Sequence, residues 1–127
     1  MTIENGIEIK EALSLIKNKI SGCQVFVSHN NEFDYDVLLS SFQRHNVEIF
    51  SNKLELYDTM KASINLCQLD RYGDNYGFKY PSLSELLKRC FFPEVKYLNG
   101  FSTKHNTLAN ARITAVCFIA MKTKFKL

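Results

Sequence analysis

Two short segments of this 127-residue chain combine residue types that could do chemistry. The first is His29-Asn30-Asn31-Glu32-Phe33-Asp34, and the second runs from His105 to Asn110. A carboxylate such as that of Asp34 can hold a divalent cation, and a loop histidine such as His105 can act as a general base near neutral pH. Taken singly, each segment also has a structural interpretation. Asp34 would complement a helix dipole, and His105 would cap a helix.

The apolar periodicity indicates the elements that must position these residues. It predicts helices over 8–21, 33–45 and 106–124, with strands over 24–28 and 53–57. The sequence Ser82-Leu83-Ser84-Glu85 after Pro81 is a capping box that opens a further helix, and Asp58-Thr59 caps a helix of its own. Residues 65–80 are expected to be irregular. We place Phe33, Val37, Leu38 and Phe42 on the apolar side of the second helix, and Ala109, Ile113, Val116 and Ala120 on that of the last.

This order of elements predicts the α/β class with a parallel component. The first polar segment then lies at the carboxyl end of a parallel strand, where α/β proteins place their sites. However, two strands are too few for the centre of such a sheet, and Gln24–Ser28 is apolar enough for an inner strand. We therefore expect residues 1–127 to form a single, incomplete domain that lacks N-terminal strands, with an edge that recruits another strand.

Composition bounds the class of protein. The chain is 46% apolar and 23% charged, as in globular domains. Its net charge is +3, and its Lys and Arg residues are spread along the sequence apart from Lys122, Lys124 and Lys126. It has no apolar run of membrane-spanning length and no signal peptide, so we expect a cytoplasmic protein with no membrane partner. The four cysteines form no CxxC pair and are expected to be buried and reduced.

Together the two polar segments resemble the motifs of the DEDDh-type 3′–5′ exonucleases, which include the proofreading epsilon subunit of bacterial DNA polymerase III. The second motif is matched by Phe26-Val27-Ser28-His29-Asn30 with Phe33-Asp34, and the third by His105 to Arg112 at the start of the last helix. Asp58-Thr59-Met60 and the segment from Tyr80 to Leu86 are similar to intervening parts of the family. The resemblance covers nearly the whole chain.

The resemblance implies a ribonuclease H-like fold and hydrolysis of a phosphodiester at a single-stranded DNA or RNA 3′ end by two Mg²⁺ or Mn²⁺ ions. Asp34 would be a metal ligand and His105 the general base. Asn30 and Phe33 would lie near the terminal nucleotide. A polymerase, or a second chain that completes the sheet, would be a partner.

The sequence departs from the family in two ways. No Asp-x-Glu occurs anywhere in the chain, so the first motif is absent. Asn110 stands where the third motif has Asp, and an amide offers Mg²⁺ an oxygen but no charge. Of the four metal carboxylates only Asp34 remains, so we expect an exonuclease-like domain that is truncated or degenerate and weak or inactive alone.

Three other interpretations stay open. The chain is a non-catalytic module that binds nucleic acid or a polymerase, an exonuclease whose Asp-x-Glu comes from a second polypeptide, or a Cys–His hydrolase. The last is the least favoured, because Cys90 and Cys117 lie in apolar helical surroundings.

Overall fold

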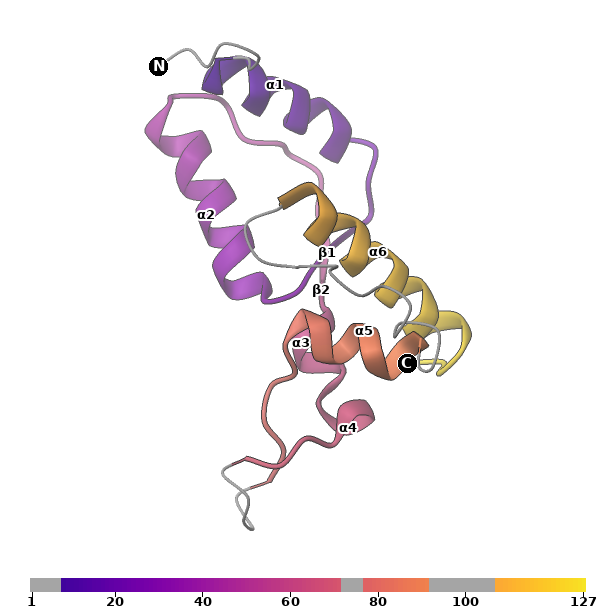
Figure 1. Cartoon of the computed structure of the whole chain (residues 1–127). Helices are drawn as coiled ribbons and strands as arrows, with labels where there is room; N and C mark the ends of the chain where they lie inside the picture. Colours follow the sequence, from indigo (N-terminus) through magenta and orange to yellow (C-terminus); the bar gives the residue numbers. More distant parts are fainter. Residues whose placement is uncertain (1–7, 72–76, 92–106) are drawn as a thin grey trace. The chain divides into compact units, whose positions relative to one another are not determined.

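A computed structural model describes residues 8–71, 77–91 and 107–127 (Figure 1). Within these residues helices predominate, and the elements follow the order α1 (Ile9–Ile20), β1 (Val25–Ser28), α2 (Asn31–Arg44), β2 (Glu55–Asp58), α3 (Thr59–Ala62), α4 (Ile64–Cys67), α5 (Leu83–Phe91) and α6 (Thr107–Thr123). The chain is therefore a mixed α/β protein, as predicted. The ribonuclease H-like arrangement stays a prediction.

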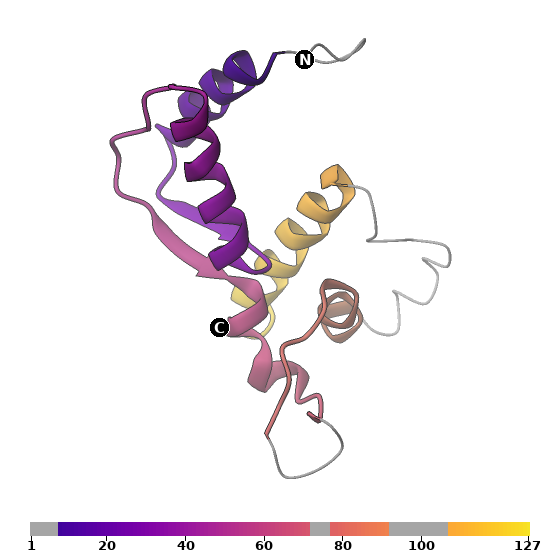
Figure 2. The ribbon, with the colours of Figure 1, turned by 90° about the vertical axis from the view of Figure 1, so that its left-hand side faces the viewer.

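The two strands form one parallel sheet and lie side by side (Figure 2). The pairing begins where the Glu55 backbone N–H donates to the Gln24 carbonyl oxygen at 2.9 Å. In the described part of the chain, β1 pairs with β2 alone. Because the strands are parallel, their carboxyl ends, at Ser28 and Asp58, lie at the same edge of the sheet.

The described residues divide into two compact units. The first draws on the segments Met1–Phe26 and Asn31–Leu56, and the second on Val27–Asn30 and Tyr57–Leu127. Each strand contributes its first two residues to the first unit and its last two to the second.

The core of the first unit joins α1, α2 and the connection to β2. Its buried residues are Leu13, Ile20, Phe42 and Phe50, and the Phe42 and Phe50 rings meet edge to face with centroids 6.0 Å apart. The predicted apolar side of α2 was correct for Leu38 and Phe42 but wrong for Phe33 and Val37, which are 65% and 49% exposed. The side chains that pack in this core are instead those of Tyr35, Leu38, Leu39 and Phe42. The buried face of α2 is therefore rotated about the helix axis relative to the predicted face.

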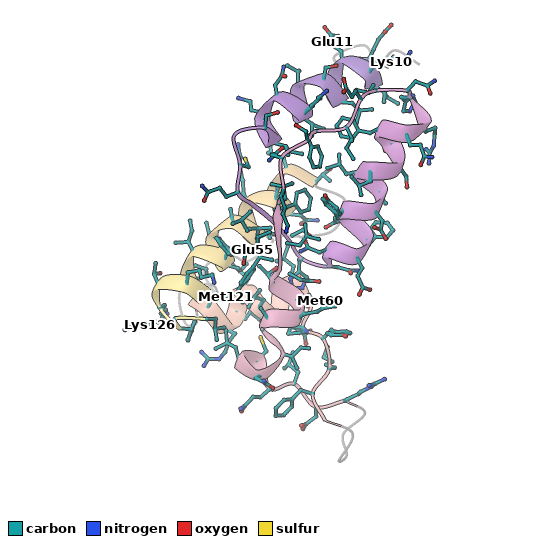
Figure 3. All side chains as sticks on the ribbon, turned by 180° about the vertical axis from the view of Figure 1, so that it is seen from behind. Lys10, Glu11, Glu55, Met60, Met121 and Lys126 are labelled. Carbon is teal, nitrogen blue, oxygen red and sulfur yellow. The ribbon has the colours of Figure 1, made fainter. Side chains whose placement is uncertain are left out.

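The core of the second unit lies where α5 packs against α6. Its buried residues are Leu86, Leu87, Cys90, Ile113, Cys117, Ala120 and Met121. Met121, labelled in Figure 3, is fully buried. On α6, Val116 was predicted to face the core but is 44% exposed, while Thr114 is buried and donates to the Asn110 carbonyl oxygen at 2.8 Å.

Local signals set the ends of α3 and α5. The Ser82–Glu85 capping box forms as predicted. The Glu85 N–H donates to Ser82 Oγ at 3.1 Å, and the Ser82 N–H donates to Glu85 Oε1 at 2.9 Å. Between these helices the expectation of an irregular segment was partly wrong. Residues 64–67 form α4, and Gln68 ends it in the left-handed conformation with φ 49°.

Candidate functional site

The carboxyl ends of the two strands bring His29 and Asn30 against Asp58 and Thr59. All four residues belong to the second unit. Parallel neighbours end at the same edge of a sheet, so the pairing of β1 with β2 brings these residues together. The hydrogen bonds at this edge decide which of these groups could do chemistry.

Asp58 ties the end of β1 to the start of α3. Its Oδ1 accepts from the backbone N–H of Asn30 at 2.9 Å, of Met60 at 2.9 Å and of Lys61 at 3.4 Å. Asp58 is thus the N-cap of α3 and at the same time fixes Asn30, whose φ is 91°. A non-glycine residue at positive φ is strained and needs such support. The geometry therefore gives Asp58 a positioning role.

The His29 ring is held at both nitrogens. Nε2 lies 2.7 Å from the Pro81 carbonyl oxygen, and Nδ1 lies 2.9 Å from Thr59 Oγ1. Since a carbonyl oxygen can only accept, Nε2 carries a proton and donates it to Pro81. The ring therefore joins the end of β1, the start of α3 and the residue before the α5 capping box. In this arrangement His29 is a structural bridge, and neither nitrogen is available as a general base.

The protonation state of His29 decides where the Thr59 hydroxyl proton goes. Thr59 Oγ1 also lies 3.2 Å from the Ser28 carbonyl oxygen. If the ring is neutral, the Thr59 hydroxyl donates its proton to Nδ1, and the Ser28 carbonyl oxygen receives no hydrogen bond from it. If the ring is charged, Nδ1 donates to Oγ1, and the hydroxyl proton goes to Ser28. The fully buried Thr59 thus connects His29 to the backbone of β1.

The site residues predicted from the sequence lie in different parts of the chain. Asp34 and Phe33 are exposed in the first turn of α2, in the first unit. Asn30 and Asn110 belong to the second unit, and His105 lies outside the described residues. The Asn30 backbone N–H donates to Asp58, and the Asn110 carbonyl oxygen accepts from Thr114.

Asn110 has an unusual environment in the first turn of α6. Its Oδ1 is buried and finds no hydrogen-bond partner among the described residues. A buried acceptor left in this way costs about 1–3 kcal/mol. Asn110 is the residue that the sequence analysis matched to the metal-binding Asp of the third motif.

The donor set does not fit a two-metal centre. Within residues 8–71, 77–91 and 107–127 no three His, Cys, Asp or Glu side chains are grouped so as to hold a metal ion. Asp58 is committed to backbone N–H groups, and Asn110 brings no charge. Hard cations bind clusters of carboxylates, so we derive no step through Mg²⁺ or Mn²⁺ from these residues.

The buried cysteines are poor nucleophiles. Cys90 and Cys117 are both fully buried in the core of the second unit. The hydrogen bond that the Cys117 thiol donates to Cys90, followed by burial, raises the pKa of Cys117 far above its usual value. The same hydrogen bond, first among the causes, lowers the pKa of the Cys90 thiol. A thiol needs access as well as its thiolate form to react, and full burial denies access to both. The expectation of buried thiols was wrong for Cys23, which is exposed.

The charge of the chain is segregated between its two parts, so the expectation that it is spread along the sequence was wrong. Residues 57–127 contain eleven Lys and Arg against five Asp and Glu, whereas residues 1–56 contain five against eight. Residues 27–30 carry no Lys, Arg, Asp or Glu, so the second unit has a formal charge of +6 and the first −3. Dividing the sequence at residue 56 would have revealed this difference.

Comparison of the chain with protein-family models, with curated proteins and with solved structures finds no match. The fold class of the chain therefore comes from the structure alone, and it is mixed α/β with a small parallel sheet. In the described part of the chain, no helix has the length and apolar character needed to cross a membrane.

Proposed function

We propose that this chain is a nucleic-acid-binding domain of exonuclease-like type that takes single-stranded DNA or RNA and does not cut it with its own residues alone. The observation that carries the proposal is the formal charge of +6 on the second unit beside −3 on the first. A basic domain binds phosphates by releasing condensed counterions, and its affinity then falls steeply with salt.

The motif resemblance supports the choice of a nucleic-acid end as the ligand. In that family Asn30 and Phe33 would lie near the terminal nucleotide, Asp34 would hold a metal ion and His105 would be the base. Hydrolysis by two Mg²⁺ or Mn²⁺ ions needs carboxylates in number, and the motifs of this chain retain Asp34 alone. Binding without hydrolysis is therefore the activity that these residues support best.

A partner that adds strands is part of this proposal. The described sheet has two strands, and an isolated pair is marginally stable in water. A polymerase or another chain that extends the sheet would also supply side chains that this chain lacks.

The binding proposal is tested with the full chain and fluorescein-labelled dT20 and rU20, by fluorescence anisotropy in 50 and 200 mM NaCl. We expect binding that weakens linearly in log–log form as salt rises. The double variant Lys88→Glu/Arg112→Glu reverses two exposed charges of the second unit, and Lys10→Glu/Lys53→Glu reverses two exposed charges of the first. Both pairs change the net charge equally, so a matching loss in both, or no binding at 50 mM, would contradict the proposal.

The absence of hydrolysis is tested separately. We expect no release of nucleotides from 3′-labelled single-stranded DNA in the presence of Mg²⁺ or Mn²⁺. Release that disappears in both Asp34→Ala and His105→Ala would show that the chain cuts with the residues the motifs indicate, and would overturn this part of the proposal.

A further inference from the structure

Three exposed cations lie where the carboxyl-terminal ends of α5 and α6 meet (Figure 1). Lys124 Nζ, just after α6, donates to the carbonyl oxygen of Cys90 in the last turn of α5 at 2.9 Å. Arg89 Nε donates to the Leu66 carbonyl oxygen at 3.1 Å and so joins α5 to α4. The third cation is Lys122, in the last turn of α6. We call Arg89, Lys122 and Lys124 the basic surface, and all three belong to the second unit.

Aromatic rings hold these cations in place. The centroid of the Phe125 ring lies 4.8 Å from Arg89 Cζ and 5.7 Å from Lys124 Nζ. The ammonium group of Lys122 lies 4.5 Å from the centroid of the Tyr57 ring. Cation–π attraction positions a charge without neutralising it. The basic surface therefore presents its charges at defined places, and the cations occupy the ring faces that a ligand would otherwise contact.

The charges of the basic surface are not balanced. No ion pair between described residues includes Arg89, Lys122 or Lys124. The hydrogen bonds of Arg89 and Lys124 go to carbonyl oxygens, which carry no net charge. Cations at helix C-termini offset the helix dipole, but each helix end carries only about half a unit of negative charge, so the two ends balance roughly one of the three cations.

The positive potential acts on the neighbouring core. The pKa of the Cys90 thiol is lowered first by the hydrogen bond from Cys117 and then by the charges of Arg89 and Lys124. These two cations share the Phe125 ring and repel each other. An anion bound between them would relieve this repulsion, so the surface favours a ligand with closely spaced negative charges.

The phosphate backbone of a single strand has this chemistry. Every nucleotide carries one negative charge, and Arg and Lys contact the phosphate oxygens while condensed counterions leave the strand. Base stacking needs an open ring face, and the cations already lie over Phe125 and Tyr57. The formal charge of +6 on the surrounding unit attracts the same polyanion. The contacts are therefore with phosphates and not with bases.

We infer that the basic surface of Arg89, Lys122 and Lys124 holds the phosphate backbone of single-stranded nucleic acid without reading its bases. Each of the three side chains contacts a phosphate. The inference rests on the proposed function, and it specifies where the strand is held and by which part of the ligand.

The first experiment counts the phosphate contacts. The variant Arg89→Gln/Lys124→Gln removes two charges and keeps polar side chains that donate hydrogen bonds. For single strands the slope of log affinity against log salt is about −0.7 for each phosphate contacted, so the variant should flatten the slope for dT20 by about 1.4. In 50 mM NaCl its affinity should fall about tenfold or more. The variant Lys88→Gln/Arg112→Gln removes two exposed charges from the same two helices and should flatten the slope by less than half as much.

A charge-retaining exchange separates the effect of charge from that of folding. Arg89→Lys/Lys124→Arg keeps both charges but alters the side chains that bond to Leu66 and Cys90. We expect it to keep most of the wild-type slope. A slope flattened as much as in the glutamine variant would mean that disturbed packing, and not the missing charge, weakens binding, and would contradict the inference.

The second experiment locates the strand on the wild-type chain. Acetic anhydride acetylates exposed lysines, and mass spectrometry measures how far dT20 slows the reaction at each of them. We expect protection of Lys122 and Lys124, and no protection of Lys10 and Lys53, which are exposed in the first unit. A base-free phosphodiester oligomer of the same length should protect equally. Clearly weaker protection by that oligomer would show that bases are contacted and would overturn the inference.

The outcomes distinguish this inference from the proposed function. If the wild-type chain binds dT20 but the glutamine variant keeps the wild-type slope, or if Lys122 and Lys124 are not protected, the basic surface is wrong, and nucleic-acid binding stands. Protection by oligoglutamate or by phosphatidylserine vesicles that equals that by dT20 would assign the surface to an acidic protein or a membrane and overturn the inference. If the wild-type chain binds neither dT20 nor rU20, the proposed function fails, and the inference falls with it.

Discussion

The Asp58 carboxylate and the Asn30 backbone N–H meet at 2.9 Å, across the carboxyl ends of two parallel strands. The same carboxylate oxygen caps α3 through Met60, also at 2.9 Å. One side chain therefore stabilises two turns of the backbone, including the positive φ of Asn30. This contact therefore fixes Asn30, the residue between the end of β1 and the start of α2.

Removing that carboxylate should be costly. We expect Asp58→Ala to lower the free energy of unfolding by about 2 kcal/mol, because a lost N-cap costs about 1 kcal/mol and the lost bond to Asn30 about 1 more. Asp58→Asn keeps an acceptor oxygen and should cost less than half as much. Urea denaturation measures both. Asp36→Ala, an exposed change on α2, is the control, and an equal loss in all three variants would contradict the role of Asp58.

His29 and Thr59 should be energetically coupled. A double-mutant cycle of His29→Phe and Thr59→Val should give an interaction energy of about 1 kcal/mol, because either change already removes the 2.9 Å contact between Nδ1 and Oγ1. The same His29 variant combined with Thr114→Val should be additive, since Thr114 bonds within α6. Additivity in the first cycle would mean that the ring and the hydroxyl act separately.

Local signals predicted more of this structure than long-range ones. The capping box at Ser82 and the cap at Asp58 use partners within three residues, so their geometry follows from sequence spacing. The tie from His29 to Pro81 spans 52 positions. A histidine after a strand and a proline before a capping box do not indicate that they are in contact, so the sequence did not predict this hydrogen bond.

The faces of the helices were harder to predict. Helix α6 is apolar on nearly every side, so periodicity could not decide that Thr114 is buried and Val116 exposed. On α2 the predicted and the observed buried faces share Leu38 and Phe42 and differ by a rotation about the helix axis. The choice depends on Phe50, which packs on Phe42 from the connection to β2.

The capping box of α5 should give the stability of the chain a pH dependence. The hydrogen bond from Lys79, supported by the Ser82 N–H, lowers the pKa of Glu85. A carboxylate whose pKa is depressed on folding contributes stability above its unfolded pKa of about 4.3, and the contribution disappears as the pH falls through the lower folded pKa. The melting temperature of the chain should therefore exceed that of Glu85→Gln at pH 6, and the difference should vanish toward pH 3.

The Lys79 contact can be isolated in the same assay. Lys79→Met removes the largest cause of the shift in the pKa of Glu85. The pH range over which the chain loses stability should then move upward, toward 4.3. An unchanged range would show that Lys79 does not determine the pKa of Glu85.

The cysteines should differ in reactivity. Cys23 is exposed, whereas Cys90 and Cys117 are fully buried. The hydrogen bond with Cys90, followed by burial, also raises the pKa of the Cys117 thiol. A chromogenic disulfide reagent at pH 8 should therefore label Cys23 in the native chain and reach Cys90 and Cys117 after unfolding in urea. In Cys23→Ser the rapid phase should be lost. Rapid labelling of Cys117 in that variant would mean that the core of the second unit opens readily.

Asn110 offers the sharpest test of the region where the family would bind metal. Its buried Oδ1 has no partner within the described part of the chain. Asn110→Ala removes that acceptor and introduces a better helix former, so the free energy of unfolding should stay the same or rise by up to about 1 kcal/mol. Asn110 is half-buried, but its Oδ1 atom is buried. Asn110→Asp therefore puts charge where that oxygen lies, and the N-terminal helix dipole offsets only part of the cost.

The Asn110→Asp variant should accordingly be less stable than the wild type at pH 7 by about 1 kcal/mol or more. Burial raises the pKa of a carboxyl group, so the loss should appear as the pH rises above the unfolded value near 3.9 and should be absent below it. Melts at pH 3.5 and pH 7, with and without millimolar Mn²⁺, measure this. A variant as stable as the wild type at pH 7 without Mn²⁺ would show that the oxygen of residue 110 is already solvated. Stabilisation by Mn²⁺ of this variant, but not of the wild type, would show that the single missing charge keeps a cation from binding there.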